Sequence, residues 1–169
     1  MTALILLSIL SAEPKSLVGF AGFSKDGASF AWVAPGASKA MKSQFVKIAK
    51  VGGGDPEMSM FFPGEASSEK KAQETLKDFS SKRTPAPKDL KIESQITLTP
   101  PKLTLIRGDK KVEVELGKYP FEKTDIAEVW GVSADGKHVA IQIHGPDVPG
   151  LLSKGGGNDF VQYFLAPLP

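Results

Sequence analysis

Residues 20–33 read Phe-Ala-Gly-Phe-Ser-Lys-Asp-Gly-Ala-Ser-Phe-Ala-Trp-Val, and this stretch decides the fold class. Two apolar, aromatic-rich runs flank a short polar segment that contains Asp26-Gly27. Glycine adopts a positive φ without strain, and aspartate hydrogen-bonds to its own backbone, so Asp-Gly between apolar runs is typical of a β-hairpin turn. The sequence therefore predicts two antiparallel strands joined at this turn.

The same turn recurs near the end of the chain. Ser133-Ala134-Asp135-Gly136 follows Ser24-Lys25-Asp26-Gly27 at an offset of 109 residues, and Gly131 stands where Gly22 stands in the first copy. Apolar runs again lie on both sides, from Glu128 to Val132 and from His138 to His144. A second hairpin of the same kind is predicted here.

The Ser-x-Asp-Gly hairpin is similar to the hairpin motif of TolB-like β-propeller repeats. Two copies separated by a helix cannot supply the several blades that a propeller needs, so we do not expect that architecture. The order of elements along the whole chain resembles a family of predicted secreted bacterial proteins of unknown function, and residues 22–31 carry its early Gly-Phe-Ser-x-Asp-Gly-x-x-Phe-Ala motif. The resemblance implies secretion and a β-rich fold, and it implies no catalytic residues.

Between the two hairpins the hydrophobic period changes. Ala72, Leu76 and Phe79 are spaced i, i+4 and i+7, which predicts an amphipathic helix over residues 66–82. Ser67 or Ser68 is the expected N-cap, and the prolines at positions 85 and 87 are expected to prevent the helix from continuing. Further strands are predicted at residues 44–51, 92–99, 103–106, 112–116 and 160–165.

The predicted architecture is α+β with β dominant. It consists of an antiparallel, hairpin-built sheet, curled or two-layered, with one amphipathic helix against it. At 169 residues the chain has the size of one domain, which we expect to occupy residues 13–169.

Composition excludes several classes of function. Lys and Arg total 21 against 19 Asp and Glu, and only Arg83 and Arg107 are arginines, so nucleic acid is not an expected partner. The absence of cysteine excludes disulfides, thiolate metal sites and cysteine nucleophiles.

The N-terminus indicates export. Residues 3–10 are almost purely apolar, small residues follow at Ser11 and Ala12, and the run is too short for a permanent membrane span. We expect residues 1–12 to be a signal peptide and the protein to be periplasmic or secreted. The alternative is a buried first strand in a cytosolic domain.

No constellation of residues predicts catalysis, a metal or a cofactor. His138 and His144 would lie about 20 Å apart on a continuous strand, too far to share a metal, and they are expected to face solvent. Ser24 and Ser133 lack the context of a nucleophile elbow. Asp26 and Asp135 are expected to be turn formers, with a calcium or ligand site as the minor alternative.

The predicted function is therefore that of an exported, non-enzymatic binding or envelope-associated domain with an envelope or extracellular partner. The alternative is a hydrolase or another enzyme with an unfamiliar site. Large aromatic side chains commonly anchor interfaces, and four of them are expected to be exposed and to mark the contact surface: Phe61, Phe62, Trp130 and Tyr163.

Overall fold

The computed structural model describes residues 17, 19–35, 43–51, 55–95, 101–116, 124–145 and 161–169. The predicted signal peptide and the glycine-rich stretches at 52–54 and 155–157 lie outside these residues. The elements are β1 (Ala21–Ser24), β2 (Ser29–Pro35), β3 (Gln44–Lys50), β4 (Glu57–Phe61), α1 (Ala66–Leu76), β5 (Phe79–Ser80), β6 (Lys91–Gln95), β7 (Lys102–Arg107), β8 (Lys110–Glu115), β9 (Ile126–Val132), β10 (His138–His144) and β11 (Val161–Pro167).

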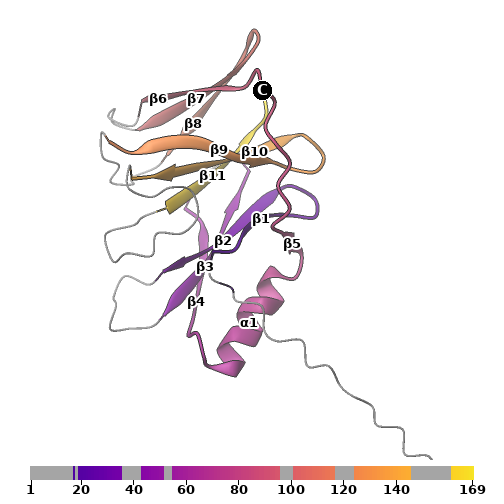
Figure 1. Ribbon diagram of the computed structural model, residues 1–169, viewed down its shortest axis with the longest axis vertical. Coiled ribbons are helices and arrows are strands. Elements are labelled where there is room, and N and C mark those ends of the chain that lie inside the picture. Colours follow the sequence, from indigo (N-terminus) through magenta and orange to yellow (C-terminus); the bar gives the residue numbers. More distant parts are fainter. Residues whose placement is uncertain are drawn as a thin grey trace, which may run out of the picture.

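The strands form three antiparallel sheets, so the predicted α+β class with β dominant is confirmed. Sheet A has the order β4-β3-β2-β1-β5, sheet B the order β11-β10-β9, and sheet C the order β6-β7-β8. Figure 1 shows sheet C, sheet B, sheet A and α1 stacked in that order along the long axis. Both predicted Asp-Gly hairpins are confirmed as β1–β2 and β9–β10, and β7–β8 is a third hairpin.

An aromatic core fills the space between sheets A and B. Phe23, Phe30 and Trp32 from sheet A meet Trp130 and Tyr163 from sheet B. The Phe30 ring is edge-on to the Phe23 ring at 5.0 Å and to the Trp130 ring at 4.9 Å between centroids. Edge-to-face contacts of this kind add to the free energy gained by burying the rings.

A second, aliphatic core joins sheets B and C. Val139, Ile141 and Ile143 of β10 pack against Leu103 and Leu105 of β7. Since Ala140 on the alternate face of β10 belongs to the aromatic core, β10 is buried on both faces. The prediction of a curled or two-layered sheet did not include sheet C. This third sheet covers the apolar face of sheet B that sheet A leaves open.

The single helix is shorter than predicted. It ends at Leu76 rather than Lys82, and Phe79 and Ser80 form β5, which pairs with Ser24 and Phe23 of β1. The edge of β1 is open to a further strand, and this tertiary pairing overrides the helical period. The expected serine N-cap is also wrong: Glu65 holds that position without a side-chain cap. No helix in the described part of the chain combines the length and the apolar character needed to cross a bilayer.

The segment after α1 crosses the edges of two sheets. Ser80 pairs with Phe23 of β1, and four residues later Thr84 forms an isolated bridge with Val132 of β9. Phe23 and Val132 are equivalent positions in the two copies of the repeat, which are 109 residues apart. One segment therefore contacts the same position of both hairpins. Each contact lies next to a glycine that both copies of the repeat contain, Gly22 in the first and Gly131 in the second. Because glycine has no side chain, the backbone of the crossing segment can approach the hairpin closely.

Candidate functional site

Three of the four aromatic residues that were expected to mark a contact surface are buried. The exposed fractions are 3% for Phe61, 6% for Trp130 and 6% for Tyr163, so their predicted exposure is wrong. Trp130 and Tyr163 lie in the aromatic core, and Phe61 packs under α1 with Ala72 and Leu76. Only Phe62 is exposed, at 39%.

Three of the four exposed large apolar side chains in the described part of the chain lie instead in or beside β4. Met58 is 62% exposed and Met60 is 54% exposed, and Phe62 follows the last residue of β4, whereas the fourth, Ile126, lies on β9. We call these three residues the β4 patch. Phe62 was predicted to mark a contact surface, whereas the two methionines were not. The alternation of Glu57, Met58, Ser59 and Met60 is a strand signal, but no strand was predicted at these residues.

The position of β4 in the fold explains this exposure. Met58 and Met60 lie opposite Lys47 and Phe45 of β3, on the face of sheet A that is turned toward sheet B. β11, an edge strand of sheet B, packs over β2 and β3 (Figure 1). Sheet B therefore covers β4 less than it covers β2 and β3. The methionines thus lie where the second layer ends.

A shallow groove runs between β4 and α1 on the other face of the sheet. Ser59 and Phe61 line it from the strand, and Lys71 and Thr75 line it from the helix. Lys71 is the only charged residue in its lining, and none of the ion pairs among the described residues includes this lysine. Within the part of the chain that the structure describes, the groove therefore offers one positive charge that belongs to no ion pair.

The outer edge of β4 lacks three features that commonly protect a sheet edge. Five consecutive residue pairs join it to β3 without a register shift, so it contains no bulge, and the strand has no lysine or proline. Its one charged side chain, Glu57, is paired with Lys50. At the opposite end of sheet A, the edge of β1 is covered by β5.

The two histidines occupy different environments on β10. His138 is partly exposed, whereas His144 is 6% exposed, so the prediction that both face solvent is wrong for His144. Its Nδ1 lies 2.7 Å from the carbonyl oxygen of Gly145, and its Nε2 lies 3.1 Å from a carboxyl oxygen of Glu128. A carbonyl oxygen and a carboxylate oxygen are hydrogen-bond acceptors, so the two contacts hold the imidazole ring in a fixed orientation between Gly145 and Glu128.

The Tyr163 phenol is held in its protonated form. The Tyr163 hydroxyl donates to the side-chain oxygen of Gln142 at 3.4 Å. Burial raises the pKa of Tyr163 to about 12. This phenol therefore acts as a hydrogen-bond donor near neutral pH.

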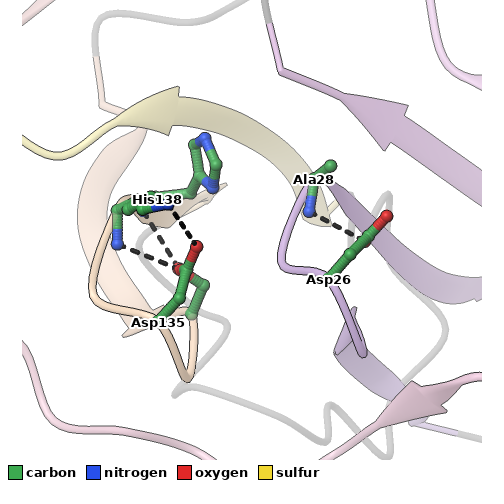
Figure 2. A network of polar contacts seen from close by, with 6 residues as sticks. Asp26, Ala28, Asp135 and His138 are labelled. Atoms are coloured by element: carbon green, nitrogen blue, oxygen red, sulfur yellow. Dashed lines mark hydrogen bonds and ion pairs between the residues drawn. The ribbon is translucent and has the colours of Figure 1, made fainter.

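The two Asp-Gly turns share the same hydrogen bonds to their aspartates, which confirms the turn-forming role of both aspartates. The Ser24 hydroxyl donates to Asp26 at 2.6 Å and the Ala28 amide donates to it at 3.1 Å. Ser133 donates to Asp135 at 2.6 Å, in the same way. Figure 2 shows the two turns near each other, each carboxylate bonded within its own turn.

These bonds leave the turn residues little capacity for other chemistry. Both serine hydroxyls are directed at carboxylates of their own turns, and Ser133 is completely buried. No group of three or more potential metal ligands occurs among the residues that the structure describes. The turns thus act as structural elements at the end of the sandwich.

No family model, curated protein or solved structure matches this chain significantly. The geometry of the described residues makes the β4 patch with the adjoining groove the candidate functional site.

The turn aspartates predict a specific loss of stability in acid. Hydrogen bonds from Ser24 and Ser133 lower the pKa of Asp26 and Asp135 below the ordinary value of 3.8. A carboxyl group whose pKa is depressed by folding stabilises the protein above its unfolded pKa, and that stabilisation disappears as the pH falls through the folded pKa. We expect the Asp26→Asn/Asp135→Asn variant to lose less stability than the natural chain between about pH 5 and pH 2.

Thermal unfolding followed by circular dichroism at several pH values measures this difference. Asparagine keeps a side-chain oxygen that can form the same turn, so the variant is expected to fold at pH 7. Parallel pH profiles for the two proteins would contradict the assignment of these carboxylates as acid-sensitive.

Proposed function

We propose that the protein is an exported domain, periplasmic or secreted, that acts by binding an envelope or extracellular partner through the β4 patch and performs no catalysis. The observation that carries this proposal is the exposure of Met58, Met60 and Phe62 along an unprotected sheet edge. An exposed apolar patch beside free backbone hydrogen-bonding groups is typical of surfaces that bind another chain. Methionine suits such a surface because its flexible thioether adapts to its partner.

Export is supported by the sequence. The apolar run at 3–10, followed by Ser11 and Ala12, has the layout of a signal peptide. N-terminal sequencing of the protein recovered from its native host tests this part: a chain that begins near Glu13 supports export, and one that begins at Met1 opposes it.

The contact surface can be tested in the native host with a photo-cross-linking amino acid. We expect the probe at position 58 or 62 to give a discrete cross-linked product that does not form from position 113. Glu113 is a matched control because it is also an exposed strand residue, but it lies in sheet C, away from β4. Equal yields at all three positions would contradict the proposal.

A second candidate function, hydrolysis, is favoured only by the pair of His144 and Glu128, since a carboxylate that orients an imidazole is a common catalytic arrangement. The burial of His144, which is 6% exposed, opposes this reading because a catalytic imidazole must reach its substrate. A hydrolytic activity that disappears in the His138→Gln/His144→Gln variant would overturn the binding proposal.

A further inference from the structure

We infer that the partner bound by β4 is a second copy of this chain, paired strand to strand in antiparallel orientation about a two-fold axis at Ser59. This inference rests on the proposed function, which makes β4 the contact surface, and it names the occupant of that surface. The two copies of sheet A would then form one continuous sheet, with β4 of each copy at the centre.

The backbone of β4 is suited to such pairing. Its inner side pairs with β3 over all five residues, and no strand in the described part of the chain pairs with its outer side. With a two-fold axis perpendicular to the sheet, the face of sheet A that is turned toward sheet B lies on the same side in both copies. Centring the axis on Ser59 pairs β4 over its full length, whereas an axis at a neighbouring residue shortens the pairing.

The side chains agree with this register on the face turned toward sheet B. Residues directly opposite each other in an antiparallel pair point to the same face. An axis at Ser59 places Met58 of one copy opposite Met60 of the other, and the reverse pair follows by symmetry. Four exposed methionine side chains would bury one another, which supplies an apolar driving force.

The opposite face provides charge complementarity. In the same register, Glu57 of one copy lies opposite Phe61 of the other, at the groove lined by Lys71. Lys71 belongs to none of the ion pairs between described residues. Glu57 keeps 65% of its side chain exposed in its pair with Lys50, so its carboxylate has room to accept from a second cation. Exposed ion pairs contribute little free energy, so we expect the charges to select the register and the methionines to supply the affinity.

A single cysteine tests the axis directly because the chain contains no cysteine. In the Ser59→Cys variant of the full chain, the two new thiols would lie on directly opposite residues, with Cα atoms about 4.5 to 5.5 Å apart, which suits a disulfide. We expect mild oxidation to convert most of this variant to a covalent dimer. Glu57→Cys is the matched control: its two Cα atoms would lie about 13 Å apart, too far for a disulfide.

Analytical ultracentrifugation of the cysteine-free chain gives an independent readout. We expect a mass of two chains that falls to one chain on dilution, and we expect Met60→Lys to be monomeric at the same concentration because an edge lysine opposes strand pairing. Circular dichroism checks that each variant is folded. A monomeric natural chain at about 100 μM, or equal cross-linking of the two cysteine variants, would overturn the inference.

The two proposals fail in different ways. If the natural chain is monomeric but position 58 still cross-links selectively to a different protein in the host, the second copy is ruled out and the binding function remains. If position 58 cross-links no better than position 113, the contact surface itself is wrong.

Discussion

Phe30→Ala is expected to lower the free energy of unfolding by about 3 to 5 kcal/mol, the range observed when a buried aromatic ring is removed. Phe30 is completely buried, and its ring lies within 5.1 Å of the rings of Phe23, Trp130 and Tyr163, measured between centroids. Its removal would leave a cavity at the place where sheets A and B meet. Urea denaturation followed by tryptophan fluorescence measures the loss.

Phe62→Ala is the control for this prediction because it removes the same ring from the surface. Phe62 is 39% exposed, and surface substitutions of this kind usually change stability by no more than about 0.5 kcal/mol. Comparable losses in the two variants would mean that the interface between sheets A and B contributes less to stability than the packing indicates.

Gly22→Ala is expected to destabilise the protein by about 3 kcal/mol, near the upper end of the range for overpacking. A Cβ atom on Gly22 would lie 2.2 Å from the backbone oxygen of Ser80 and 2.5 Å from its carbonyl carbon. Both are backbone atoms of β5, so no side-chain rotation can relieve the clash. The substitution would push β5 away from β1.

Gly131→Ala provides the matched comparison within the repeat. Its Cβ atom would lie 3.2 Å from the backbone oxygen of Thr84, a contact that a small shift can accommodate, and we expect a loss of about 1 kcal/mol. Hydrogen exchange adds a local readout, since the Lys25 amide, which donates to the carbonyl of Asp78, should exchange faster only in Gly22→Ala. Equal losses of stability in the two variants would contradict the conclusion that the backbone of Ser80 lies closer to Gly22 than the backbone of Thr84 lies to Gly131.

The repeated hairpin could be predicted from the sequence, but the tertiary contacts that its two copies make could not. The spacing of the two Ser-x-Asp-Gly turns indicates two similar hairpins, and their hydrogen bonds are the same in detail. Nothing in that pattern indicates that residues 79–84 pair with both hairpins. Sequence periodicity over 66–82 instead predicted a longer helix, because an apolar residue such as Phe79 satisfies a helical period and a strand equally well.

Of the three residues in the β4 patch, only Phe62 was predicted from the sequence, and the two methionines were missed for a related reason. Aromatic residues were expected on the surface because they commonly anchor interfaces, yet Trp130 and Tyr163 fill the space between two sheets. The exposed side chains are methionines on a strand that was not predicted. Exposure depends on which neighbouring layer covers a residue, and that information is absent from local residue patterns.

Local sequence patterns were sufficient to predict the Asp-Gly turns, most of the strands and the predominance of β structure. These features depend on backbone preferences and on alternation within a few residues, so they can be predicted without knowing the rest of the chain. Three other features became evident only from the fold: three sheets stack, β5 rather than a longer helix follows α1, and β4 lies at the edge of sheet A. Each of these depends on contacts between segments far apart in sequence, whose free energy arises when one layer covers another.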